Sequence, residues 1–294
     1  FHAGAEALPD PDAPPGAWHA LVGVPPTESP DFVLLADPFT FPAESLTAGL
    51  DFAYPSAVKV GGLASGGRSR GDQVLFAGDA IHRSGAVGLA VSGDVTLAPA
   101  IAQGCRGIGP VLRITDCEGN LLRALDGKPA LARVQEVLRE ASEGDQRLAR
   151  TSALLLGVET DPFAADEEAW LVRNFLGRER DGEGLFVGES LRAGRRVRLQ
   201  VRDLVTSSED LDRTLASTAD GPGAGCRGAL LFCCSGRGMH LYGTPDHDTR
   251  AFHARFGAVP VGGFFCAGEI GPVGRSTHLH GFTSAFALFR PKTP

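Results

Sequence analysis

Short apolar runs alternate with glycine- and proline-rich breaks along most of this chain, and one order of elements occurs twice. Two strands flank a helix in each copy, and the second strand ends in a glycine pair. This pattern predicts two βαβ units that form a weak internal repeat. The predicted elements are a strand at Phe32–Ala36, a helix at Pro42–Leu50 and a strand at Val58–Gly62, then a strand at Ala229–Phe232, a helix at Thr249–Phe256 and a strand at Val259–Gly263.

The segments between the copies have the character of hairpins. We expect one hairpin at Val111–Leu125, turning at Glu118-Gly119-Asn120, and another at Leu185–Val201, turning at Arg192-Ala193-Gly194. Arg196–Arg202 alternates between apolar and polar residues, which predicts a strand that covers a core on one side. Helices are expected from Pro129 and over Thr206–Leu215.

These elements predict an α+β (mixed α/β) fold with two pseudo-repeated halves. Each half would be a mixed sheet with a βαβ unit and hairpins, and its helices would pack on the sheet faces. We place the halves at residues 1–126 and 127–294.

Composition narrows the class of protein. The 294 residues are 43% hydrophobic and 21% charged, as in an ordinary globular protein, and the net charge of −7 opposes nucleic-acid binding. No apolar run approaches the roughly 18 to 20 residues that span a bilayer. The six cysteines form no CxxC pair, so we expect free thiols and a cytoplasmic location. His2–Pro15 is unlike a signal peptide, and we expect the sequence to be truncated at its start.

The segment Val259–His280 concentrates polar side chains among glycines, which predicts a ligand-facing loop of irregular path. Cys266 lies near Glu269, His278 and His280 in sequence, but the spacing matches no catalytic signature, and a small buried residue is the simpler interpretation. The two histidines would share one strand face, yet they lack closed-site metal spacing. We therefore expect no metal or other cofactor.

A second glycine-rich turn, Ser235-Gly236-Arg237-Gly238, follows an apolar strand. Its backbone amides and Arg237 suit an anion or a small polar ligand, with a tight structural turn as the alternative.

Several stretches, in order along the chain, resemble the FIST domain family of F-box and intracellular signal transduction proteins, with its N-terminal and C-terminal parts. In the first half they are Leu34–Phe39, Val60–Gly67, Gly85–Gly93, Gln103–Arg106 and Glu118–Asn120, and in the second half Leu171–Asn174, Ser235–Gly238, Gly263–Pro272 and His280–Ser284. The resemblance implies a stand-alone bacterial sensory module that binds a small molecule such as an amino acid and acts through a signalling partner protein.

Together, these observations favour a non-enzymatic binding protein. Glu269 would pair with a ligand amine, Arg237 or Arg275 would pair with a carboxylate, and other residues would line the pocket. Two alternatives stay open, namely a hydrolase or transferase that uses Cys266 and an interaction scaffold without a small ligand. The full candidate set is Cys234, Ser235, Arg237, Gly238, Cys266, Gly268, Glu269, Gly271, Arg275 and His280.

Overall fold

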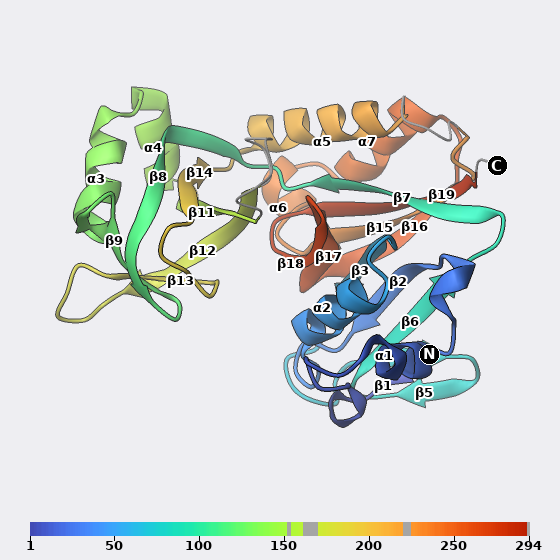
Figure 1. Ribbon diagram of the computed structural model, residues 1–294. Coiled ribbons are helices and arrows are strands. Elements are labelled where there is room, and N and C mark those ends of the chain that lie inside the picture. The colour runs from blue at the N-terminus through green and yellow to red at the C-terminus, as the bar shows by residue number, and fades with distance from the viewer. Residues whose placement is uncertain (152–153, 161–169, 220–224, 293–294) are drawn as a thin grey trace. The chain divides into compact units, whose positions relative to one another are not determined.

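The computed structural model describes residues 1–151, 154–160, 170–219 and 225–292. The chain forms two compact units (Figure 1). One unit combines Phe1–Gln103 with Leu211–Pro294, and the other is Gly104–Asp210. The chain therefore leaves the first unit and later returns to it.

The first unit contains two mixed sheets. The six-stranded sheet has the order β1 (His2–Ala3), β6 (Ala86–Val91), β2 (Asp31–Ala36), β3 (Lys59–Leu63), β17 (Gly268–Val273) and β18 (Ser276–His280). The four-stranded sheet has the order β16 (Val261–Cys266), β15 (Gly228–Cys234), β19 (Ser284–Pro291) and β7 (Val95–Ala102). A small hairpin joins β4 (Leu75–Ala77) to β5 (Ala80–His82).

Both predicted βαβ units are confirmed. Strands β2 and β3 are parallel and flank α2 (Ala43–Ala53), and β15 and β16 are parallel and flank α6 (Met239–Tyr242) and α7 (His247–Phe256). Each copy is followed by a strand that joins the other sheet. Strand β7, which comes after the first copy, pairs with β19 in the four-stranded sheet, and β17, which comes after the second copy, pairs with β3 in the six-stranded sheet. Each sheet therefore contains strands from both the N-terminal and the C-terminal part of the sequence.

Four layers make up this unit (Figure 1). Val33, Val60 and Phe232 belong to an apolar core between the two sheets. Helices α1 (Pro15–Val22) and α2 cover the outer face of the six-stranded sheet around the buried ring of Trp18. Helices α5 (Leu204–Ala219) and α7 cover the outer face of the other sheet, where Leu211 and Phe252 are buried. Two short 3-10 helices lie at Ala5–Ala7 and Pro26–Glu28.

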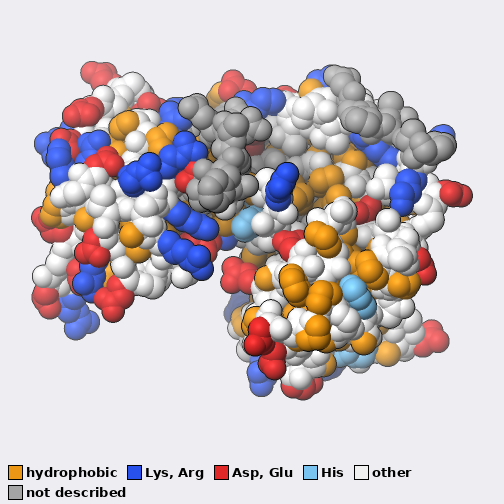
Figure 2. Space-filling model, viewed as in Figure 1, with side chains coloured by type: hydrophobic (Ala, Val, Ile, Leu, Met, Phe, Trp, Pro, Cys, Tyr) orange, Lys and Arg blue, Asp and Glu red, His pale blue; other side chains and the backbone are white. Residues whose placement is uncertain are grey.

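The second unit is an antiparallel sheet that closes on itself, because β8 pairs with both β14 and β9. Its strands are β10 (Lys128–Pro129), β9 (Leu121–Leu125), β13 (Leu185–Val187), β12 (Trp170–Arg178), β11 (Leu154–Glu159), β14 (Arg196–Val201) and β8 (Arg106–Glu118). Helix α3 (Ala130–Glu140) packs Val134 and Val137 on its core, and α4 (Glu143–Thr151) follows. Acidic and basic side chains are interspersed on the face shown in Figure 2.

The hairpin predicted at Val111–Leu125 is confirmed as β8 and β9, but the one predicted at Leu185–Val201 is wrong. The chain does turn at Gly194, whose φ is +90°, yet β13 pairs with β12 and β9, whereas β14 pairs with β11 and β8. Val197, Leu199 and Val201 of β14 join the core as their alternation predicts. Strand β14 therefore pairs with β11 and β8, which are distant in sequence and help to bury its apolar face, and not with the neighbouring strand β13.

The irregular loop predicted at Val259–His280 is also wrong, because most of the segment forms β16, β17 and β18. Its glycines allow close packing of strands. A Cβ on Gly263 would lie 1.9 Å from the Leu231 oxygen, and one on Gly62 of β3 would lie 2.4 Å from the Cys266 sulfur. Among the described residues, no helix has the length and apolarity needed to cross a membrane.

Candidate functional site

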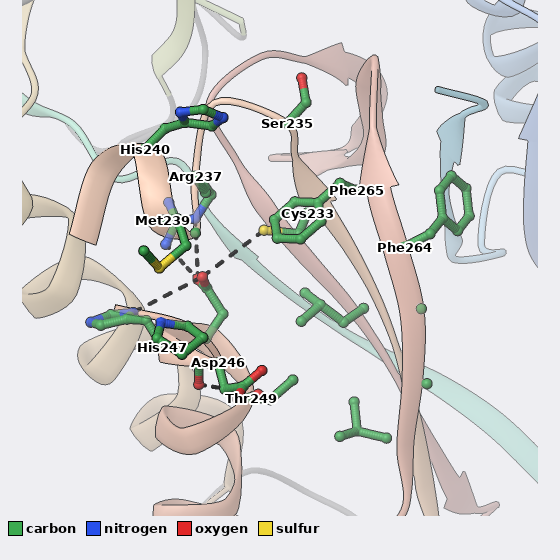
Figure 3. Close-up of a pocket in the computed structure, with 17 residues that line it drawn as sticks. Cys233, Ser235, Arg237, Met239, His240, Asp246, His247, Thr249, Phe264 and Phe265 are labelled. Atoms are coloured by element: carbon green, nitrogen blue, oxygen red, sulfur yellow. Dashed lines mark hydrogen bonds and ion pairs between the residues drawn. The ribbon is translucent and has the colours of Figure 1, made fainter. Parts of the chain in front are cut away.

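A cleft of about 720 Å³ opens in the first unit where the parallel strands β15 and β16 end (Figure 3). Strand β16 forms one wall, α6 and the start of α7 form the other, and the Ser235–Gly238 turn closes the end. Carboxyl ends of parallel strands are common ligand sites in open sheets, and this volume suits a small ligand.

The floor of the cleft is a buried ion pair. Arg237, which is 1% exposed, places Nη2 2.7 Å and Nε 3.1 Å from Oδ1 of Asp248. Its Nη1 donates to the Phe282 carbonyl oxygen at 3.1 Å, and Nη2 donates to the Tyr242 hydroxyl. The Ser284 hydroxyl donates to Asp248 at 2.8 Å. The guanidinium that the sequence suggested for a ligand carboxylate is therefore held by a carboxylate of the protein.

Local sequence explains the turn that carries Arg237. The Ser235 amide donates to the Cys266 oxygen at 3.0 Å and the Arg237 amide donates to the Cys234 oxygen at 2.9 Å, so the turn bridges β15 and β16. Gly238 has φ +62°, and a Cβ there would lie 2.9 Å from the Phe265 ring. Both its conformation and the ring packed over it require glycine.

His247 lies beside the ion pair, with its ring stacked 3.5 Å from that of Tyr242. Its Nδ1 is 4.0 Å from Oδ2 of Asp248. Burial lowers the pKa of His247 below its usual range, although the Asp248 carboxylate opposes that shift. Burial therefore favours the neutral form of the imidazole in the wall of the cleft.

Acidification is expected to destabilise the first unit through His247. The unfolded imidazole has a pKa of about 6.5 and the folded one a lower pKa, so between these values the unfolded state binds more protons. The free energy of unfolding should therefore fall as the pH drops below about 6.5. Urea titrations from pH 7.5 to 5.5 would measure this. The variant His247→Phe retains a ring against Tyr242 but cannot titrate, so its decline should be smaller, and an equal decline would exclude His247 as the cause.

Three of the ten residues proposed from sequence, namely Ser235, Arg237 and Gly238, line the cleft. The others lie elsewhere in the first unit. Cys234 ends β15, Gly268 and Gly271 are in β17, and Arg275 lies exposed between β17 and β18. Glu269 is fully buried and accepts a hydrogen bond from the Thr283 amide at 3.2 Å. His280 is buried with Nε2 3.0 Å from the Gly271 oxygen.

The thiol of Cys266 is poorly suited to nucleophilic attack. It is fully buried, and burial followed by the nearby Glu269 carboxylate raises its pKa far above the usual range. The Cys233 thiol lines the cleft, but burial and then Asp248 raise its pKa to about 12. Because the thiolate is the reactive form, the raised pKa makes both thiols less nucleophilic than an ordinary cysteine.

Sequence reasoning missed several cleft residues, among them Asp248, Phe265 and Met239. Asp248 had one signal, since it follows directly on the start of a helix, where an acidic side chain is favourable. Phe265 lay within the predicted ligand-facing loop but was not proposed as a site residue, and its side chain is 51% exposed. The described residues contain no group of three or more His, Cys, Asp or Glu side chains placed to hold a metal ion.

Comparisons with known proteins identify two family domains in the chain. Residues 3–128 match the FIST N domain and residues 130–272 match the FIST C domain. The uncharacterized protein Mb0898c of Mycobacterium bovis is 36% identical over 259 residues, and the uncharacterized protein Rv0628c of Mycobacterium tuberculosis is 36% identical over 260 residues. Each alignment covers 87% of this chain and 67% of the relative. The chain belongs to the FIST domain family.

Proposed function

We propose that this protein is a non-enzymatic sensory module that binds a small polar molecule, such as an amino acid, in the cleft between β16 and α6–α7. FIST domains are associated with signal transduction and ligand sensing. The observation that carries the proposal is the cleft itself, whose charged floor is fixed in advance by the Arg237–Asp248 pair. A preorganised polar floor orients a ligand without a large ordering cost.

Asp246 is the residue we assign to a ligand amine. It is exposed at the rim of the cleft, immediately before α7, and the exposed side chains of Ser235 and His240 also line the cleft. This assignment replaces Glu269, whose buried carboxylate does not line the cleft.

A calorimetric screen of amino acids and related metabolites would test this function. At least one compound should bind, and Asp246→Asn should weaken that binding about tenfold. Asn preserves the shape of the side chain and tolerates the left-handed backbone (φ +59°) at this position. Arg275→Ala, outside the cleft, is the matched control and should bind normally. A binder weakened only by Arg275→Ala would exclude the cleft as its site, and a screen with no binder would exclude a free amino acid or related metabolite as the ligand.

We also place the protein in the cytoplasm, with a signalling protein as its output partner. None of the six cysteines forms a disulfide in the described part of the chain, as suits a reducing compartment. The partner is inferred from the family association with signal transduction.

A further inference from the structure

Strand β16 is an unprotected edge of its sheet. It pairs with β15 on one side and stands at the end of the four-stranded order. Four successive residues, Gly262 to Phe265, are exposed, and the strand contains no charged residue. Proteins normally protect such edges with charges, bulges or a covering segment, because open edges add strands from other chains. An edge left open beside a cleft therefore indicates a binding surface.

Main-chain groups of alternate residues point out from this edge. The Ala229 amide donates to the Pro260 oxygen and the Ser235 amide donates to the Cys266 oxygen, so the even-numbered residues of β16 bond to β15. The amide and carbonyl groups of Val261 and Gly263 then face outward, and no described residue bonds to them. The Phe265 carbonyl also faces outward and accepts a hydrogen bond from Ser65.

Side chains of the same odd-numbered residues face the cleft. Figure 3 shows the Phe265 ring directed towards Arg237 and the Phe264 ring directed away. Val261 also lines the cleft and packs on the cluster beneath α7. Gly263 lies between them without a side chain, so the apolar wall has a gap directly beside the outward-facing main chain.

We propose that the ligand of this cleft is a short peptide in extended conformation that adds to β16 as a fifth strand and places a bulky apolar side chain beside Gly263. The inference rests on the proposed function, because it takes the same cleft as the ligand site and proposes amino acids joined in a peptide as the ligand. Main-chain bonds to Val261 and Gly263 would hold the peptide, as in other strand-addition complexes. Phe265 and Met239, which are 51% and 58% exposed, would cover its side chain.

A second copy of this chain fits the edge less well. The outward-facing residues are centred on Gly263, so antiparallel pairing of β16 with its own copy would set Gly263 against Gly263. Val261 would face Phe265 of the copy, whose carbonyl oxygen already accepts a hydrogen bond from Ser65. Such a pair brings no side chain to the gap in the cleft wall, whereas a peptide does.

N-acetylated, C-amidated alanine pentapeptides with a central Phe, Leu or Lys would test the proposal by calorimetry. The Phe and Leu peptides should bind, and the Lys peptide should bind more weakly. Methylation of the central peptide nitrogen should weaken binding at least tenfold because it removes a main-chain donor. Val261→Pro removes the outward amide and should also weaken binding at least tenfold, whereas Val261→Ala retains the amide and should stay within threefold.

The outcomes separate this inference from the proposed function. If free amino acids bind and no pentapeptide does, the peptide inference is overturned and the sensory function stands. If neither binds, both fail. Pentapeptide binding that tolerates N-methylation overturns strand addition even if Val261→Pro does not fold. Sedimentation that shows a dimer sensitive to Val261→Pro would assign the edge to a second copy and overturn the peptide.

Discussion

Arg237→Ala is expected to lower the free energy of unfolding of the first unit by about 3–5 kcal/mol. The substitution leaves the Asp248 carboxylate buried without its cation, and an unpaired buried charge costs several kcal/mol. Asp248 would retain the Ser284 hydroxyl at 2.8 Å, which offsets only part of that cost. Urea denaturation at pH 7.5 would measure the change. A Trp170→Phe background leaves Trp18, a buried core residue of the first unit, as the only tryptophan reporter.

Two further variants separate pairing from general damage. Arg83→Ala removes an exposed guanidinium from the same unit, where it donates to the Gly71 oxygen at 3.1 Å, and should leave the free energy of unfolding nearly unchanged. The double variant Arg237→Met with Asp248→Leu removes both charges and should recover much of the stability that Arg237→Ala loses. If Arg237→Ala lowers the free energy of unfolding no more than Arg83→Ala does, the buried Arg237–Asp248 pair does not stabilise the first unit.

The repeated βαβ order was readable from sequence because each copy is a local unit. Apolar strands, a helix and a glycine pair follow one another within about 35 residues in each copy, and their order alone predicts parallel pairing. The sequence did not predict that β7 would join the four-stranded sheet or that β17 would join the six-stranded sheet. Those strands pair with partners far away in the sequence, and no local pattern specifies which sheet a strand joins.

The site was predicted in part for the same reason. Arg237 stood out because it follows a strand in a glycine-rich turn, a local signal. Asp248 did not stand out, since only the placement of α7 brings its carboxylate to Arg237. Glycines around Glu269 suggested a loop, but close strand packing also selects glycine, and a sequence does not distinguish the two causes.

Gly263→Ala is expected to destabilise the first unit by about 3 kcal/mol or more. The new Cβ would lie 1.9 Å from the Leu231 carbonyl oxygen, and that atom belongs to the backbone of the central strand β15 and cannot rotate away. Overpacking against a flexible side chain typically costs 1–3 kcal/mol, and a backbone contact of this kind should reach the top of that range. The same measurement in urea, with Trp18 as reporter, would detect the loss.

The adjacent glycine is the matched control. A Cβ on Gly262 would meet nothing within 4 Å, so Gly262→Ala should leave stability unchanged or raise it by up to about 1 kcal/mol through the unfolded chain. In the first copy, Gly61→Ala should repeat the loss, because its Cβ would lie 1.8 Å from the Leu34 oxygen. Equal stability of Gly262→Ala and Gly263→Ala would contradict the close approach of β15 and β16.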